Sequence, residues 1–225
     1  MPAMIAMRGH MKRGYEDTYT DMSPMESLSV AISRGKIATA RRIVNQAGSE
    51  IQLNGALDHE RGHTPLTLAA KHGHVDIVKF LIERGADVEQ RNACSDMTAV
   101  MYAMIERHEH VIDFLIGIGA RVQDRNRYGW TAVMMAVMYG TADMLGCVLG
   151  TARGVDVSSD DCGKALRIAI AQGKAGHVSK LLDAGVNAHH RNRNHDDALE
   201  LALKHGKEEI ALMIAQKRSA VMADE

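Results

Sequence analysis

The sequence has few aromatic residues, few cysteines and no long apolar run. Only 4% of its 225 residues are aromatic, with one tryptophan and two phenylalanines, which favours helices stacked through small side chains. The three cysteines are odd in number and lack Cys-x-x-Cys spacing, so we expect reduced thiols in a cytoplasmic compartment and no disulfide framework. No run approaches the roughly 18 apolar residues of a membrane span. The N-terminal apolar run is too short for a signal peptide.

Charge of one sign is also lacking. The chain has 27 Lys and Arg against 28 Asp and Glu, a formal net charge of −1. No excess charge points to a nucleic acid or a membrane surface as a partner. Asp124, Asp160 and Asp161 interrupt any continuous basic face, which nucleic-acid binding would require. We therefore expect neither nucleic acid nor membrane among the partners.

The histidines raise the question of a catalytic or metal site. The 12 histidines include close pairs, but His108 and His110 have neither a helical His-x-x-x-His spacing nor a third ligand nearby. No phosphate-binding Gly-x-x-x-x-Gly-Lys loop or Gly-x-Ser-x-Gly elbow occurs. Cys147 is expected to be a small core residue, and Cys94 the most exposed thiol, without a neighbouring base. We predict no catalytic residues, no metal and no cofactor, hence a non-enzymatic protein. The histidine pairs are His72 and His74, His108 and His110, and His189 and His190.

What the chain does have is a unit at residues 64–88 that predicts two short helices joined by a turn. Thr64 fits an N-cap, and Pro65 fits the first helical position, where a missing N–H costs nothing. Gly73 fits the end of the first helix, because glycine reaches a left-handed conformation cheaply. Such short helices are unstable alone in water, so the unit needs neighbours to cover its apolar faces.

The neighbours follow at intervals of 33 or 34 residues. From Thr64, equivalent positions fall at Thr98, Thr131, Lys164 and Asp197. Lys164 and Asp197 replace the threonine, so we expect the last two units to lack that cap. One apolar position recurs as Leu66, Val100, Val133, Leu166 and Leu199, a small one as Ala69, Ala103, Ala136, Ala169 and Ala202, and the turn glycine as Gly140, Gly173 and Gly206.

A period near 33 with a turn and two helices resembles the ankyrin repeat family. The resemblance implies an all-α solenoid of six helix-turn-helix units with short β-hairpin-like fingers. It spans residues 23–218, with repeats starting near 26, 64, 98, 131, 164 and 197. The first and last units are expected to present polar outer sides. Residues 1–22 are expected to be a flexible tail, either without a role or a docking or phosphorylation segment, and 219–225 a frayed end.

The middle of the array is expected to be the softest part. Methionines replace the usual leucines there, and Gly146 and Gly150 fall in or near a second helix, where each costs roughly 1 kcal/mol against alanine. We predict that amides of residues 141–157 exchange fastest among the inner repeats.

The resemblance also implies where a partner binds. In ankyrin proteins the finger tips and first helices form a concave contact face, which marks a set of positions here. Aromatic and arginine side chains dominate interface energies, so Tyr128, Trp130 and Tyr139 are the sharpest candidates. Trp130 could instead pack on its neighbouring finger. Around these three, the predicted contacts are Met97, Ile105 and Met138, together with Arg61, His63, His72 and Arg127.

Arginines that open the fingers allow two interpretations. Each of them precedes an asparagine at the start of a finger: Arg91, Arg125 and Arg191. A row of arginines could grip an acidic ligand, or each could be an ordinary solvated finger tip.

The resemblance predicts a monomeric protein that binds another protein on a preformed surface, which limits the ordering entropy lost on association. Two alternatives remain open. One is a structural component of a cytoskeletal or multi-subunit assembly, and the other is an inhibitory subunit that covers a partner enzyme or transcription factor.

Overall fold

The computed structural model describes residues 22–57, 62–150, 155–191 and 196–223. These residues form helices joined alternately by short turns and by longer finger loops, and they contain no strand. Within these ranges, no helix is both long and apolar enough to cross a membrane. The helices are α1 (Pro24–Ser33), α2 (Ile37–Ala47), the 3₁₀ helix η2 (Gly48–Glu50), α3 (Pro65–Lys71), α4 (Val75–Glu83), α5 (Ala99–Glu106), α6 (Glu109–Gly117), α7 (Ala132–Tyr139), α8 (Ala142–Leu149), α9 (Asp160–Ala171), α10 (Ala175–Asp183), α11 (Ala198–Lys204) and α12 (Glu208–Ala223).

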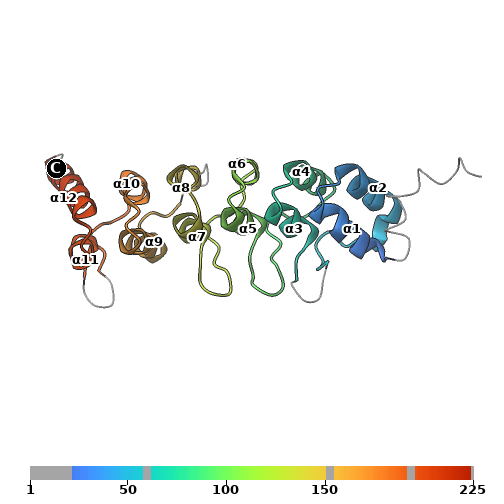
Figure 1. Cartoon of the computed structure of the whole chain (residues 1–225), viewed down its shortest axis with the longest axis horizontal. Helices are drawn as coiled ribbons and strands as arrows, with labels where there is room; N and C mark the ends of the chain where they lie inside the picture. Colours follow the sequence, from blue (N-terminus) through green and yellow to red (C-terminus); the bar gives the residue numbers. More distant parts are fainter. Residues whose placement is uncertain (1–21, 58–61, 151–154, 192–195, 224–225) are drawn as a thin grey trace, which may run out of the picture.

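The α-helices pair in chain order, and the pairs lie side by side in a single file (Figure 1). The first helices of the pairs (α1, α3, α5, α7, α9 and α11) form one row, and the second helices form the other. Finger loops extend past the first-helix row, away from the second helices. Each helix packs mainly on its own pair and on the adjacent pairs, for example α5 on α3, α6 and α7. The predicted all-α repeat solenoid is confirmed.

A continuous apolar strip runs through the file between the two rows. The alanine position predicted from the repeat is fully buried in all five units, since the side chain of Ala69 and its four equivalents has no exposed surface. Small side chains there let consecutive first helices approach closely. The second helices contribute larger residues such as Leu81, Leu115 and Leu181, each with no exposed surface. The apolar periodicity of the sequence is thus the periodicity of the core.

The N-caps agree with the prediction in part. Thr64 caps α3 as expected: its Oγ1 accepts from Thr67 N at 3.1 Å, and Thr67 Oγ1 accepts from Thr64 N at 2.8 Å. The expected loss of caps in the last two units was wrong. Asp197 Oδ1 accepts from Glu200 N at 3.0 Å, because aspartate caps as well as threonine. In the fifth unit Ser159 caps α9 instead, so this helix starts earlier and Lys164 lies inside it.

Left-handed residues join the helices of most pairs, as the turn glycines predicted. Gly73, with φ of +74°, takes this conformation after α3, and Arg107, with φ of +61°, takes it after α5. Gly140 departs from the prediction because its φ is −84°. A Cβ there would approach Ala136 O to 2.7 Å, so close contact and not backbone conformation calls for glycine.

The residues that follow these turns tie each pair to the preceding one. His108 Nε2 lies 2.9 Å from Lys71 O, at the end of the previous first helix. Lys174 Nζ donates to Met138 O at 2.8 Å in the same way, and His177 Nε2 lies 3.2 Å from Gly140 O. These side chains satisfy carbonyls that a helix end leaves free. The two histidines therefore help to hold successive helix pairs together.

Asparagines fold the fingers, which close like short hairpins without ladder pairing. Asn92 Oδ1 accepts from Cys94 N and Ser95 N at 2.9 and 2.8 Å, and Asn92 N donates to Met97 O at 2.8 Å. Neighbouring fingers are linked through the backbone by a bond from Ala93 N to Gly62 O at 3.0 Å. The fingers thus form a connected edge.

The last pair exposes most of the polar residues that the sequence predicts for its outer side, but it also exposes two leucines. Leu203 is 60% exposed and Leu212 is 64% exposed, beside Leu199 and Ala215 in a shallow groove of about 360 Å³. Charged residues of α11 and α12 lie around these leucines and do not cover them. Helix α12 also continues to Ala223, beyond the predicted end of the repeats. The predicted N-terminal tail lies outside the described residues up to residue 21.

Candidate functional site

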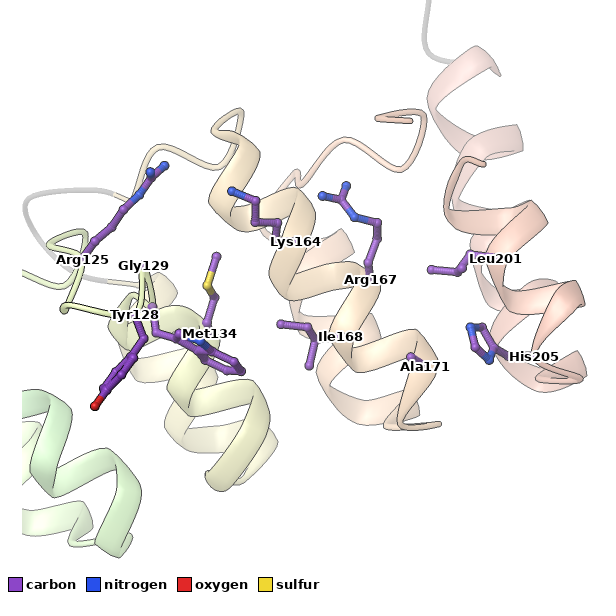
Figure 2. A pocket seen from close by; sticks show the side chains of 11 residues that line it. Arg125, Tyr128, Gly129, Met134, Lys164, Arg167, Ile168, Ala171, Leu201 and His205 are labelled. Carbon is purple, nitrogen blue, oxygen red and sulfur yellow. The ribbon is translucent and has the colours of Figure 1, made fainter. Parts of the chain in front are cut away.

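A groove of about 590 Å³ lies on the finger side of the last three units. Three first helices and one finger line it: Trp130 from the finger before α7, Met134 from α7, Ile168 from α9 and Leu201 from α11. Figure 2 shows Leu201 pointing from α11 toward α9. We call this the Trp130 groove. Its lining is Arg125, Tyr128, Gly129, Trp130, Met134, Lys164, Arg167, Ile168, Ala171, Leu201 and His205.

The aromatic end of the Trp130 groove is held by the finger backbone. Asn126 is buried, and its Oδ1 accepts from Tyr128 N and Trp130 N, both at 2.9 Å. Asn126 N donates to Trp130 O at 2.9 Å. These hydrogen bonds position both aromatic residues through their backbone groups. The bonds do not involve the aromatic rings. Tyr128 is 69% exposed, whereas Trp130 is half-buried against the core.

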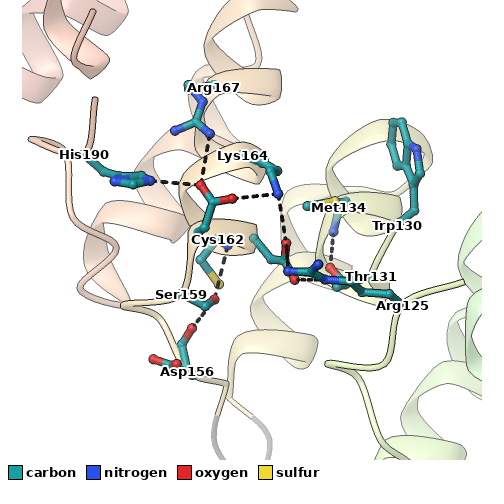
Figure 3. Close-up of polar contacts among 12 residues, drawn as sticks. Arg125, Trp130, Thr131, Met134, Asp156, Ser159, Cys162, Lys164, Arg167 and His190 are labelled. Carbon is teal, nitrogen blue, oxygen red and sulfur yellow. Dashed lines mark hydrogen bonds and ion pairs between the residues drawn. The ribbon is translucent and has the colours of Figure 1, made fainter. Parts of the chain in front are cut away.

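A cluster of ion pairs lies beside the groove at the start of α9 (Figure 3). Asp161 accepts from Arg125 Nε and Nη2 at 2.8 and 2.9 Å. Lys164 Nζ lies 2.7 Å from Asp160 Oδ2 and 3.4 Å from Asp161 Oδ1. Asp160 Oδ1 also lies 3.5 Å from Arg167 Nη2. Because both aspartates open α9, the positive end of the helix stabilises them further.

The cluster fixes the charge of the groove at neutral pH. The hydrogen bond from Lys164 holds the pKa of Asp160 below its ordinary value. The hydrogen bond to Asp161 raises the pKa of Arg125 further above its ordinary value. Both shifts favour the ionised forms of Asp160 and Arg125. His190 extends the cluster, with Nε2 2.9 Å from Asp160 Oδ1. The approach of His190 requires Gly163, where a Cβ would lie 2.7 Å from its ring.

The structure brings only part of the predicted contact set into this groove. Tyr128 and Trp130 line it, whereas Tyr139, 40% exposed at the end of α7, lies outside it. The remaining predicted contacts also lie outside the groove: Met97, Ile105 and Met138 are half-buried, and His72 and Arg127 are exposed. Arg61 lies outside the described residues. The predicted contact role of these side chains stays a prediction.

His63 is the exception, because the structure contradicts its prediction as a surface contact. Its side chain is only 3% exposed, and its ring centroid lies 4.7 Å from that of Tyr102. Asn92 Nδ2 lies 3.4 Å from His63 Nδ1 on another side. A partner cannot reach a ring enclosed in this way, so His63 joins one finger to the next helix.

Two of the finger arginines form ion pairs within the chain, which neither interpretation included. Arg91 Nη2 donates to Asp124 at 2.9 Å, and Arg125 binds Asp161 through two nitrogens. In both cases the carboxylate belongs to the next unit along the chain. Each arginine thus bridges two units, while its side chain stays partly exposed, at 37% for Arg91 and 56% for Arg125.

The cysteines offer no activated nucleophile. Cys147 is exposed, so its prediction as a core residue was wrong, whereas Cys162 is buried. Burial raises the pKa of the Cys162 thiol. Partial desolvation by neighbouring atoms, followed by the Asp113 carboxylate, raises the pKa of Cys147 although that residue is exposed, so both thiols stay protonated near neutral pH. Within the described ranges, no three His, Cys, Asp or Glu side chains meet in a way that could hold a metal ion.

The basic side of the groove was not predicted from the sequence. The repeat spacing places Lys164 at the position of the threonine caps, whereas the structure places it inside α9, near Arg167. The signal was present in the sequence, because Ser159 followed by Asp160 and Asp161 is a typical helix start. Placing the cap at Ser159 puts Lys164 inside α9, one turn before Arg167 and Ile168 and on the same side of the helix.

Comparisons with known proteins agree with this architecture. A model of the ankyrin repeat matches residues 61–93, and a model of multiple ankyrin repeats matches 100–147. Over 77 residues the chain is 32% identical to an ankyrin repeat and KH domain-containing protein from Caenorhabditis briggsae, covering 34% of this chain and 3% of that protein. Over 48 residues it is 52% identical to the probable E3 ubiquitin-protein ligase XBOS33 from Oryza sativa subsp. japonica, covering 21% and 9%. The chain thus spans less than a tenth of either relative.

Solved structures extend the similarity over most of the chain. The ankyrin repeat domain of Bcl-3, a member of the IkappaB family, has a TM-score of 0.76 at 23% identity, covering 85% of both chains. A chain in the complex of the predatory endopeptidase Bd0816 from Bdellovibrio bacteriovorus with the immunity protein Bd3460 has a TM-score of 0.67 at 25% identity, covering 85% of this chain and 97% of that one. The repeat models, the buried alanine register and the file of helix pairs lead to one conclusion: the chain is an ankyrin repeat protein.

Proposed function

We propose that this chain binds a protein partner on the face formed by its fingers and first helices, and that the Trp130 groove is the centre of that face. The observation that carries the proposal is the preformed apolar groove between Trp130 and Leu201, with the exposed ring of Tyr128 at its end. Ankyrin repeats are in general a non-catalytic interaction fold. A groove fixed by helix packing and by Asn126 loses little entropy when a partner arrives.

The test is affinity capture from a cell extract with the whole chain as bait. Tyr128→Ala is the cleanest variant, because the finger bonds use the Tyr128 backbone and the ring is mostly exposed. A second variant, Trp130→Ala/Tyr139→Ala, removes the other two predicted aromatic contacts. Leu212→Ala is the control, since it removes an equally exposed apolar side chain from the second-helix row. The partner should be retained by wild type and the control and lost from both groove variants. The same captured set with all four baits would refute the proposal.

Melting temperatures separate binding from folding in this experiment. Tyr128→Ala should change stability by no more than about 0.5 kcal/mol, as expected for an exposed residue without structural contacts. Trp130→Ala should lower stability because the ring also packs on the core. If Trp130→Ala lowers stability but leaves capture intact, Trp130 is only a packing residue.

A second candidate is that the chain inhibits an enzyme by covering its surface. The similarity to a chain of the endopeptidase–immunity protein complex favours this possibility, because it extends over nearly all of that chain. Addition of the wild-type chain should then abolish the activity of a captured enzyme at a one-to-one ratio, and Tyr128→Ala should restore it. Unchanged activity in the saturated complex would exclude inhibition.

We further propose that the chain acts as a monomer in a reducing, cytoplasmic compartment. All three cysteines are free thiols, and two of them are exposed. Light scattering of the purified chain should give a mass near 24.6 kDa, and a dimer mass would contradict the proposal.

A further inference from the structure

The Trp130 groove has a charge of one sign among its lining residues. Arg125, Lys164 and Arg167 line it, and no aspartate or glutamate of the described chain does. The carboxylates that pair with these cations, Asp160 and Asp161, lie at the start of α9 and are not part of the lining. Figure 2 shows the three cations along one edge of the groove. A ligand in the groove therefore meets positive charge.

The cations keep hydrogen-bond donors for such a ligand. Arg125 uses Nε and Nη2 for Asp161, which leaves Nη1 for another acceptor. Arg167 Nη1 is buried and has no hydrogen-bond partner within the described part of the chain, so a ligand reaches it only when the side chain moves. The only ion pair of Arg167 there is the 3.5 Å contact through Nη2. Lys164 has three donors and two carboxylate contacts. Together they can bind one or two further carboxylates.

The rest of the groove selects against a bare anion. Trp130, Met134, Ile168 and Leu201 form an apolar floor beside the cations. A volume of about 590 Å³ falls in the range of roughly 300–1,000 Å³ for pockets that hold compact ligands. A phosphate or a nucleic acid backbone would leave this floor uncovered, whereas adjacent acidic and large apolar side chains would satisfy both parts.

We infer that the Trp130 groove binds a short protein segment in which Asp or Glu stands next to Leu, Ile, Met or Phe. Its carboxylates lie against Lys164, Arg167 and Arg125, and its apolar side chain lies on Ile168 and Leu201. The inference rests on the proposed function and adds the chemistry of the partner. Apolar burial supplies most of the affinity, and the cations supply selectivity and speed of association.

The first experiment is a selection of random dodecapeptides displayed on phage against the immobilised whole chain. Selected peptides should be enriched in Asp or Glu adjacent to a large apolar residue. Synthetic versions can be titrated by intrinsic fluorescence, because Trp130 is the only tryptophan and lines the groove. Binding should weaken several-fold between about 0.1 and 1 M salt, as the screening length falls from roughly 10 to 3 Å. Selected peptides without acidic residues, or peptides that leave the fluorescence unchanged, would overturn the inference.

Charge reversal gives the sharper second test. Lys164→Glu should weaken the acidic peptide at least about tenfold, and Lys164→Gln should weaken it less. Lys180→Glu is the matched control, because Lys180 is exposed on α10 in the second-helix row. A peptide with Lys in place of its acidic residues should bind Lys164→Glu better than wild type, a gain that misfolding cannot produce. Equal binding of the acidic peptide to wild type and Lys164→Glu would overturn the inference.

The two proposals can fail separately. Selected uncharged peptides that still shift the Trp130 fluorescence would leave the groove as a protein-binding site and remove only its acidic preference. A twenty-residue oligodeoxythymidine serves as the probe for nucleic acid. If it binds wild type and not Lys164→Glu, and acidic peptides are not selected, the ligand is an anionic polymer and both proposals fall.

Discussion

Thr64 and Thr98 occupy the same position in successive units but differ in what their hydroxyls do. Thr64 Oγ1 accepts from the buried Thr67 N at 3.1 Å and Thr67 returns the bond, so each completes the other. Thr98 Oγ1 is buried, and no hydrogen-bond partner for it exists within the described chain. Replacement by valine, which has the same shape, should therefore have opposite effects at the two sites.

The magnitudes follow from these contacts. At Thr64, valine removes an N-cap and leaves a buried N–H without an acceptor, which costs about 1–2 kcal/mol. At Thr98, valine removes a buried hydroxyl that has no partner, which should gain about 1 kcal/mol. The two variants should thus differ by about 2–3 kcal/mol. For a chain of this size, each kcal/mol shifts the melting temperature by roughly 2–4 °C.

Thermal and urea unfolding followed by far-ultraviolet circular dichroism can measure both variants. Thr131→Val is an internal control with an intermediate effect, because Met134 N lies 3.4 Å from Thr131 Oγ1, farther than in the Thr64 cap. Equal destabilisation at Thr64 and Thr98 would refute the reasoning. It would mean that the position, and not the hydrogen bond, determines the effect of the hydroxyl.

Three further predictions concern the turns, the pH dependence and the local stability of the array. Gly73→Ala should lower the free energy of unfolding by about 2 kcal/mol, because φ is +74° and the new Cβ would lie 2.5 Å from His108 Nδ1. Gly206→Ala should lower it by only about 1 kcal/mol, because φ is +63° but no atom lies within 4 Å of the new Cβ. Equal urea midpoints for the two variants would contradict the steric argument. Burial lowers the pKa of His177 below its ordinary value of 6.5. As the pH falls, the His177 imidazole is therefore protonated in the unfolded chain before it is protonated in the folded chain. The free energy of unfolding should accordingly fall as the pH drops through 6.5. His177→Gln should flatten that part of the pH profile in urea unfolding, and an unchanged slope would exclude His177 as its source. Hydrogen exchange should be fastest in residues 141–157 among the inner repeats, and uniform protection of all second helices would show that the glycines there do not loosen the array.

Much of the fold could be predicted from spacing alone. The alanine of each first helix, such as Ala103, lies in the core because a repeat of 33 residues returns the same side chain to the same environment. The left-handed turn at Gly73 followed from residue type for the same reason. These features depend on local backbone geometry and on the nearest neighbour, and both repeat along the chain.

The contacts that break the repeat could not be predicted. Ser159 starts α9 earlier than the period places it, and this shift brings Lys164 and Arg167 to the groove. The pairing of Arg125 with Asp161 depends on that same shift. A register derived from other units carries no information on such a local change. The burial of a side chain also depends on side chains of neighbouring units that the repeat spacing does not specify. For this reason His63 is buried and Cys147 is exposed, contrary to expectation.

In the part of the chain that the structure describes, the helix pairs of the file contact mainly the adjacent pairs. Local damage to one unit can therefore stay local, and distant segments can open at different denaturant concentrations. A ligand lying on α7, α9 and α11 would couple the unfolding of three units, because it would contact all of them at once. In the complex these three units would melt as one block, and the array would gain a cooperativity that its own packing does not supply.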